Sequence, residues 1–389
     1  MKNRYSLILG NLGNTCDHFL PTGYKDVPPK HEMIRQATAI PDIEGIELVG
    51  SWDITETNTN EIKARLDDAA LTCVSIIPDL FSQKRWGLGS LSAKSADTRR
   101  QALEECRTVS RIARQIGCPL INLWLGQDGY DYPLTADYRT QRAHLTENIR
   151  AIASEFPDLR YALEYKPREP RNFSFHARAA DTLLMANETG LENVGVCIDV
   201  GHAFMAGENV AESAVMLQHY GKKLFHMHFN DNYRSWDDDM IVGSVHVVEY
   251  LELLHWLREI SYAGWYSMDQ YPIARTVPPP SVKAAPSCAT SKPSSPTPAA
   301  TISGNSLLLA TPPPAPVICA SCFSAMSENI HYRGTKARRQ SLQSRQVIVL
   351  HPCRRTALCA THGGGAAPPP RPPPRLGRRV LSSGKVGAQ

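Results

Sequence analysis

The chain has 389 residues, enough for one large domain or two ordinary ones, and a formal net charge of +4. Residues 277–389 hold 14 Lys and Arg but a single acidic residue, so residues 1–276, with 28 basic and 37 acidic residues, carry −9. An acidic first part argues against a nucleic-acid-binding surface, and no apolar run is long enough to span a bilayer.

The cellular setting is predicted from what the first part of the chain lacks. The apolar segment 7–9 is too short for a signal peptide and has no cleavage site after it. The cysteines of this part, at positions 16, 73, 106, 118 and 197, have no disulfide-framework spacing. We therefore expect a cytoplasmic protein with free thiols.

Eight short strands are predicted in the first part of the chain. Several are almost wholly apolar up to the last residue, as parallel strands buried on both faces are. In chain order the predicted strands are Tyr5–Leu9, Gly45–Val49, Thr72–Ile77, Leu120–Trp124, Tyr161–Tyr165, Val194–Val200, Leu224–His228 and Trp265–Asp269.

Seven helices alternate with these strands. The longest has a predicted N-cap at Asp97 and Gly117 at its C-cap position. The helices are His31–Ile40, Thr59–Ala70, Asp97–Ile116, Thr140–Phe156, Ala177–Glu188, Val210–His219 and Val247–Ile260. This alternation over about 270 residues predicts a (β/α)8 TIM barrel, whose catalytic residues cluster at the carboxyl ends of the strands. A doubly wound open sheet is the alternative, but GNLGN after the first strand matches GxGxxG poorly.

Acidic, imidazole and lysine side chains stand at or just beyond the ends of the last four predicted strands. One such residue is usually a solvated strand end, and a polar loop would explain the densest stretch, 224–240, taken alone. Four consecutive strands favour a divalent metal site, because crowded carboxylates repel one another unless a cation holds them. The residues are Glu164, Lys166, Asp199, His202, His228, Asp237, Asp239 and Asp269.

Several motifs resemble the metal-binding strand ends of the xylose isomerase-like barrels. They are LEYKPREPR, IDVGH, FHMHFNDNYRSWDDD and SMDQYP, and the third resembles L-rhamnose isomerase most closely. NLWLGQDGYDYP is similar to the Trp-Gly loop after the fourth strand of that family. The resemblance covers residues 1 to 272 and implies an isomerase that interconverts an aldose and a ketose, acts on a free sugar, and assembles as a dimer or tetramer.

The resemblance also implies two divalent ions, Mn²⁺ above all, with Mg²⁺, Co²⁺ or Zn²⁺ as alternatives. The first ion would be held by Glu164, Asp199, His228 and Asp269, and the second by His202, Asp237 and Asp239 with Asp199 bridging. Lys166 and Asp237 are the catalytic candidates, and Trp124, His202 and Arg234 the substrate-binding ones. Hydride shift and an enediol remain alternatives, and hydride shift is favoured because strand eight shows no dedicated base.

Simpler roles exist for several of these residues. Lys166 could be an ordinary exposed lysine, Trp124 a packing residue, and Arg234 one half of a structural ion pair. His226, one layer below the strand end, is predicted to be a core histidine, and Asp238 is predicted to point away from the site.

Related functions on the same barrel are the main rivals. Ketose 3-epimerases pair a strand-eight glutamate with the strand-five one, whereas this chain offers the shorter Asp269. Endonuclease IV relatives need more histidines and a basic face. Strand two ends in Glu47-Leu48-Val49, without the histidine that assists ring opening in xylose isomerase.

The remainder, residues 274–389, is rich in Pro, Ala, Ser and Arg, and 18 of the 29 prolines lie after residue 272. We predict a barrel domain over 1–273 that lacks a normal eighth helix, followed by a disordered tail. One hypothesis is that the tail is translated from a shifted reading frame. Others are a natural tail, a basic arm, a loosely spaced zinc knuckle at Cys319 and Cys322, or a truncated, non-catalytic barrel.

Overall fold

The computed structural model describes residues 3–14, 20, 22–169 and 172–271. The chain divides into two units, residues 1–332 and 333–389, and every described residue belongs to the first. The predictions for the tail, the Cys319–Cys322 pair and the eighth helix lie outside the described residues, and the boundary at 273 stays a prediction.

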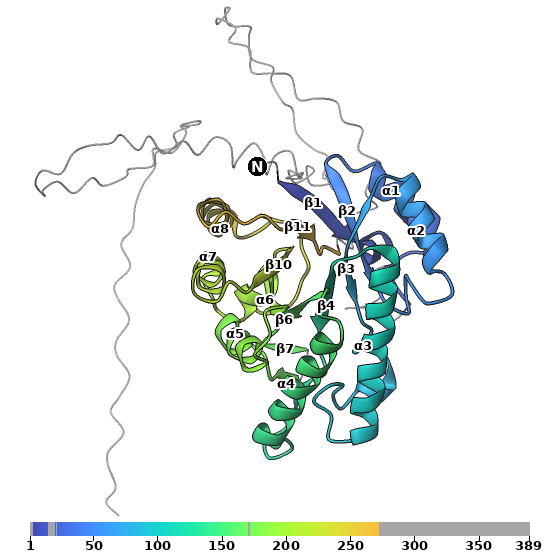
Figure 1. Ribbon diagram of the computed structural model, residues 1–389. Coiled ribbons are helices and arrows are strands. Elements are labelled where there is room, and N and C mark those ends of the chain that lie inside the picture. The colour runs from blue at the N-terminus through green and yellow to red at the C-terminus, as the bar shows by residue number, and fades with distance from the viewer. Residues whose placement is uncertain (1–2, 15–19, 21, 170–171, 272–389) are drawn as a thin grey trace, which may run out of the picture. The chain divides into compact units, whose positions relative to one another are not determined.

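Eight parallel strands close into a barrel (Figure 1). Each strand pairs with the next along the chain, and the last returns to the first, with Trp265 opposite Arg4. The strands are β1 (Arg4–Ile8), β2 (Ile43–Val49), β3 (Thr72–Ile77), β4 (Leu120–Trp124), β6 (Arg160–Glu164), β9 (Val194–Asp199), β10 (Leu224–Phe229) and β11 (Trp265–Met268). The predicted TIM-barrel fold is confirmed.

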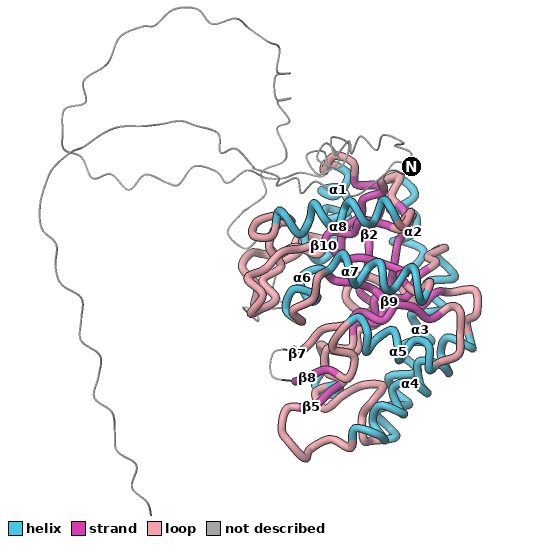
Figure 2. Tube along the Cα trace, turned by 90° about the vertical axis from the view of Figure 1, so that its left-hand side faces the viewer, coloured by secondary structure: helices cyan, strands magenta, loops and turns pink. Residues whose placement is uncertain are grey.

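Helices surround this barrel, as the two views in Figures 1 and 2 show. The predicted ones are α1 (Lys30–Thr38), α2 (Thr59–Asp68), α3 (Ala96–Ile116), α4 (Tyr138–Glu155), α5 (Ala179–Glu188), α7 (Val210–Val215) with its π-helical continuation η3 (Met216–Gly221), and α8 (Val247–Glu259). Short elements that were not predicted are η1 (Leu9–Leu12), η2 (Lys84–Trp86), α6 (Val200–Met205) and a small sheet of β5 (Gly129–Tyr130), β8 (Asn172–Ser174) and β7 (Arg168–Glu169).

The ends of α3 show which local signals the chain uses. Ser95, not Asp97, is the N-cap, because its side chain accepts a hydrogen bond from the backbone N–H of Thr98 at 3.3 Å. Asp97 lies in the first turn instead and pairs with Arg100. Gly117 ends the helix with φ +81°, a left-handed conformation that favours glycine, so the predicted C-cap is confirmed.

The strand register brings the carboxyl ends of the later strands together. Asp199 on β9 lies opposite His228 on β10, and His228 lies opposite Ser267 on β11. The four described cysteines are free, as predicted, and all four are buried. Within the described ranges, none of the helices combines the length and apolar character that crossing a bilayer requires.

Candidate metal centre

Four predicted ligands from the ends of four barrel strands meet at one point. Glu164, Asp199, His228 and Asp269 each bring one ligand atom to within 4.8 Å of the others. Nδ1 of His228 lies 3.3 Å from Oε1 of Glu164 and 3.6 Å from Oδ2 of Asp269. Glu164, Asp199 and His228 are buried, while the Asp269 side chain is 17% exposed. The predicted first ligand set is therefore assembled in the fold.

A second group shares Asp199 with the first. Asp199, His202 and Asp237 also place ligand atoms within 4.8 Å of one another. Nε2 of His202 lies 3.1 Å from Oδ2 of Asp237, and its Nδ1 lies 3.7 Å from Oδ1 of Asp199. Asp239, the remaining predicted ligand, is buried but does not belong to the ligand groups found among the described residues.

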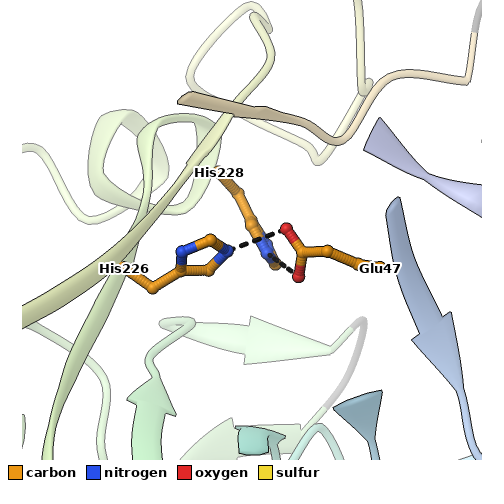
Figure 3. Close-up of side chains that lie close together, drawn as sticks. All are labelled: Glu47, His226 and His228. Atoms are coloured by element: carbon orange, nitrogen blue, oxygen red, sulfur yellow. Dashed lines mark hydrogen bonds and ion pairs between the residues drawn. The ribbon is translucent and has the colours of Figure 1, made fainter. Parts of the chain in front are cut away.

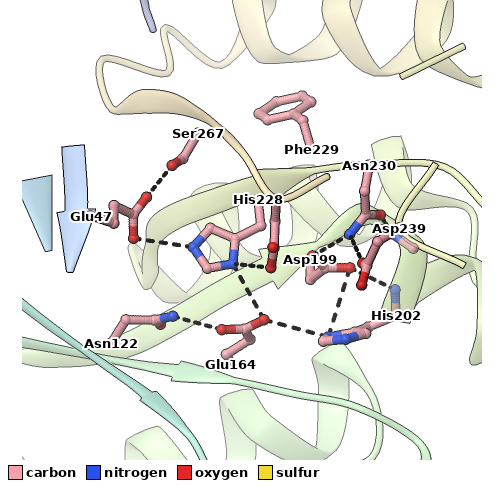
Figure 4. Close-up of polar contacts among 12 residues, drawn as sticks. Glu47, Asn122, Glu164, Asp199, His202, His228, Phe229, Asn230, Asp239 and Ser267 are labelled. Atoms are coloured by element: carbon pink, nitrogen blue, oxygen red, sulfur yellow. Dashed lines mark hydrogen bonds and ion pairs between the residues drawn. The ribbon is translucent and has the colours of Figure 1, made fainter. Parts of the chain in front are cut away.

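Asn230 orients the carboxylates that line this centre (Figure 4). Its amide nitrogen donates to Asp199 at 2.8 Å and to Asp239 at 3.1 Å, and its oxygen accepts the backbone N–H of Gly201 at 2.8 Å. A Cβ atom at Gly201 would lie 2.3 Å from that same oxygen. Glycine is thus required at position 201 by the close approach of the Asn230 side chain.

The electrostatics show how unfavourable the carboxylate cluster is without a cation. Burial, together with neighbouring carboxylates, raises the pKa of Asp239 well above its usual range. Burial raises the pKa of Asp199 to about 6, with His202 opposing the rise and Asp237 adding to it. Burial lowers the pKa of His202, but the carboxylates of Asp199 and Asp237 outweigh that effect and raise it to about 9.

Two buried atoms make the donor set fit a divalent ion. Nδ1 of His202 and Oδ1 of Asp269 have no hydrogen-bond partner among the described residues. Buried polar atoms without a hydrogen-bond partner are rare, because burial removes the water that would otherwise pair with them. Imidazole nitrogen combined with carboxylate oxygen is a ligand set for Mn²⁺, Co²⁺ or Zn²⁺.

Lys166 is enclosed beside this centre rather than exposed. The residue is 2% exposed, and its Nζ pairs with Glu169 and lies 2.8 Å from Oδ2 of Asp237. Nζ also lies 5.3 Å from the centre of the Trp124 ring. The alternative of an ordinary exposed lysine is therefore wrong. The side chain of Lys166 is buried and held at the edge of the ligand cluster.

Arg234, a predicted substrate-binding residue, belongs neither to the ligand groups nor to the lining of the cavity described below. Its guanidinium forms a 3.0 Å ion pair with Glu249 and lies 4.8 Å from the Phe204 ring. The structural ion-pair alternative is the one that the structure shows. Asp238 accepts the backbone N–H of Tyr233 at 3.0 Å and is absent from the ligand groups, which agrees with its predicted orientation.

A cavity of about 450 Å³ opens above the ligands, and the two halves of the barrel line it differently. The ligand half comes from the later strands and includes Glu164, His202, His228, Asp237 and Asp269. The apolar half comes from the first four strands and the segments that follow them, and comprises Ile8, Val49, Trp52, Ile77, Phe81 and Trp124. The Phe81 ring meets those of Trp52 and Trp124 edge-on, with centroids 5.5 and 4.4 Å away. Lys and Arg are absent from the described residues that line this cavity.

Glu47 on β2 was not predicted as part of the site. It is fully buried, and its two oxygens contact Nε2 of His226 at 2.8 Å and Nε2 of His228 at 3.3 Å (Figure 3). Burial alone would raise the pKa of Glu47, but the two histidines together hold it well below its usual range. His226 is a buried interior histidine, as predicted.

Comparison with known proteins agrees with this geometry. The chain is 26% identical over 208 residues to a xylose isomerase of Thermus thermophilus, which covers 52% of this chain and 54% of that protein. It is 28% identical over 201 residues to a probable sugar isomerase of Mesorhizobium japonicum, covering 50% and 45%. The chain thus spans about half the length of the curated relatives it matches.

Solved structures and a family model extend the comparison. A D-psicose 3-epimerase from Clostridium cellulolyticum H10, solved with D-tagatose, superposes with a TM-score of 0.54 at 16% sequence identity. The superposition covers 69% of this chain and 85% of the epimerase chain. At this sequence identity the similarity is one of fold alone. The family model described as xylose isomerase-like TIM barrel matches residues 35–287, more than half of the sequence. By its sequence and its barrel, the chain belongs to the xylose isomerase-like TIM barrel family.

Proposed function

We propose that this chain is a metal-dependent aldose–ketose isomerase that acts on a free sugar and resembles L-rhamnose isomerase. The observation that carries the proposal is the sharing of Asp199 between two ligand groups at the floor of one cavity. Relatives named xylose isomerase and probable sugar isomerase support the same reaction class.

The chain's own residues supply two adjoining positions for divalent ions. Glu164, Asp199, His228 and Asp269 would hold the first, and Asp199, His202 and Asp237 the second, with Asp239 behind them. Mn²⁺ is the ion we favour, with Mg²⁺, Co²⁺ and Zn²⁺ as alternatives. Such ions, when bound, polarise the adjacent carbonyl and hydroxyl oxygens of an open-chain sugar.

Lys166 and Asp237 act on the reacting oxygens. Lys166 does not itself line the cavity, but Glu169 and Asp237, which hold its ammonium, both do, and from this edge the ammonium donates a hydrogen bond to the sugar carbonyl oxygen. Oδ2 of Asp237 lies within reach of both Lys166 and His202; it accepts the proton of the neighbouring hydroxyl group and returns it to the former carbonyl oxygen after the carbon-bound hydrogen has moved. Asp269, directly after β11, belongs to the ligand cluster, so this last barrel strand offers no separate base, and we favour hydrogen transfer as hydride over an enediol.

The lining of the cavity supports a free sugar as the substrate class. A phosphorylated sugar would find no Lys or Arg among the described lining residues, whereas an uncharged sugar can lay its C–H groups against Trp52, Phe81 and Trp124. His202 lines the cavity, and we give it a hydrogen bond to a sugar hydroxyl beside its role as a ligand of the second ion.

The test uses the full-length chain, stripped with a chelator and reloaded separately with Mn²⁺, Mg²⁺, Co²⁺ or Zn²⁺. Aldoses and ketoses, L-rhamnose among them, are incubated and the products are separated by chromatography. We expect aldose–ketose interconversion that Glu164→Gln abolishes. Ketoses that exchange only at C3 would identify a 3-epimerase instead, and a folded, metal-loaded protein that converts nothing would support the non-catalytic alternative.

A further inference from the structure

Glu47 forms four hydrogen bonds in the barrel interior, directly below the proposed ion positions. Oε1 lies 2.8 Å from Nε2 of His226 and accepts from the Ser267 hydroxyl, and Oε2 lies 3.3 Å from Nε2 of His228 and accepts from the Ser75 hydroxyl. All five residues are at most 1% exposed. A carboxylate offers about four acceptor positions, so every acceptor position of Glu47 is filled.

This arrangement decides which nitrogen of His228 carries hydrogen. An ionised carboxylate only accepts, so the Nε2 atom that faces Glu47 must bear the proton. Nδ1 also faces carboxylates, Glu164 at 3.3 Å (Figure 4) and Asp269 at 3.6 Å, but these two are proposed ligands of the same ion, so a neutral His228 with its proton on Nε2 directs its Nδ1 lone pair to that ion position. We infer that Glu47 is a positioning residue that fixes the tautomer and ring orientation of His228 for ion binding through Nδ1. The inference rests on the proposed function, because it gives His228 the role of a ligand.

A separate ion between Glu47, His226 and His228 is the competing explanation, since their ligand atoms also lie within 4.8 Å of one another. The direct contacts of 2.8 and 3.3 Å are hydrogen-bond distances, and the two serine hydroxyls take the remaining acceptor positions. A cation there would have to displace both imidazole hydrogens. Glu47 therefore acts through His228 and does not hold an ion itself.

The tautomer can be measured without any variant of Glu47. The full-length chain is labelled with ¹⁵N-histidine and loaded with diamagnetic Zn²⁺, and two-bond ¹H–¹⁵N spectra are recorded, with the His228 signals assigned by their loss in His228→Asn. We expect a proton on Nε2 and none on Nδ1. A proton on Nδ1, with Nε2 as the ion-facing atom, would overturn the inference even if every Glu47 variant failed to fold.

Ion affinity provides the second readout. Glutamine at position 47 has a donor in place of one acceptor oxygen, so it cannot accept from both imidazoles. We expect Glu47→Gln to weaken Mn²⁺ binding about 10- to 100-fold in calorimetric titrations of the chelator-stripped chain. Ser110→Ala, which removes a buried hydroxyl bonded to Tyr161 at 2.8 Å, is the matched control and should bind as the parent does.

The two proposals fail in different ways. If the parent chain binds none of the four divalent ions tested for activity, the proposed function is wrong. If the parent binds Mn²⁺, Glu164→Gln binds it poorly and Glu47→Gln binds it like the parent, only the positioning role of Glu47 is wrong. Weakening in Ser110→Ala equal to that in Glu47→Gln would assign the effect to general loss of packing and would also overturn the inference.

Discussion

Replacing Asp199 by Asn removes one charge from the shared position of the two ligand groups. Burial, with Asp237 adding to it, raises the pKa of Asp199 from 3.8 to about 6. A rise of about 2 in pKa corresponds to about 3 kcal/mol by which ionised Asp199 destabilises the ion-free fold. Asparagine at position 199 removes the buried charge and with it this destabilisation. In the parent chain the Asn230 amide donates to Asp199 at 2.8 Å, and an asparagine amide facing it would lose this hydrogen bond at a cost of about 1 kcal/mol.

The chelator-stripped variant should therefore be more stable than the stripped parent by about 2 kcal/mol at pH 8. The destabilisation by Asp199 is complete above its folded-state pKa of about 6 and disappears as the pH approaches its ordinary value of 3.8. The advantage of the variant should thus shrink to less than about 1 kcal/mol at pH 5. Adding Mn²⁺ should stabilise the parent much more than the variant.

Urea unfolding with chelator at pH 8 and pH 5, repeated with Mn²⁺ at pH 8, measures each of these differences. Asp128→Asn is the control, because Asp128 is a buried carboxylate held by Ser90 and Ser92, outside the ligand groups, so its response to Mn²⁺ should match that of the parent. A stripped Asp199→Asn that is less stable than the parent at pH 8, or a stability difference that ignores pH, would refute the reasoning.

Three further outcomes are expected. Lys166→Met should lower kcat about 10²- to 10⁴-fold in a steady-state assay while Mn²⁺ still binds, and an unchanged kcat would remove Lys166 from the reaction. Because His202 has a raised pKa of about 9, it must lose its proton to bind an ion, so the apparent Mn²⁺ affinity should increase from pH 6 to pH 8. Calorimetry in buffers of different ionisation enthalpy should show that Mn²⁺ binding releases protons. Binding without proton release would contradict the role of His202 as a ligand. Gly201→Ala should weaken Mn²⁺ binding by displacing Asn230, whereas Gly87→Ala should not, because Gly87 has φ −58° and a Cβ there would lie at an ordinary contact distance, 3.4 Å, from the Lys84 carbonyl oxygen.

Much of the fold and half of the site follow from local sequence. The barrel strands are short, largely apolar runs, the last four of which end at or next to a charged or imidazole group, and the helices between them have ordinary lengths, so both could be located from the sequence pattern. Glu164, Asp199, His228 and Asp269 could be grouped without coordinates because parallel barrel strands all end on the same face.

The parts that were missed depend on contacts across the chain. Glu47 lies within a strand whose sequence does not reveal which residues face the barrel interior, and its partner His226 is 179 positions away. Asp239 sits in a loop with φ +45°, so the direction of its side chain could not be derived from spacing. The strands β5, β7 and β8 have only two or three residues, too few for any period to show.

The division of the cavity between an apolar half and a ligand half has a consequence for how such a protein can change. Substitutions at Ile8, Val49 or Ile77 alter the shape offered to the far end of a sugar and leave every proposed ion ligand in place. Under the proposed function, the shape of the substrate site and the ion ligands are encoded largely by separate stretches of the gene, with Glu47 and Asn122, which contact His228 and Glu164, as exceptions in the first stretch. Laboratory evolution toward new sugars can therefore vary the apolar lining residues up to Trp124 while these two residues are kept.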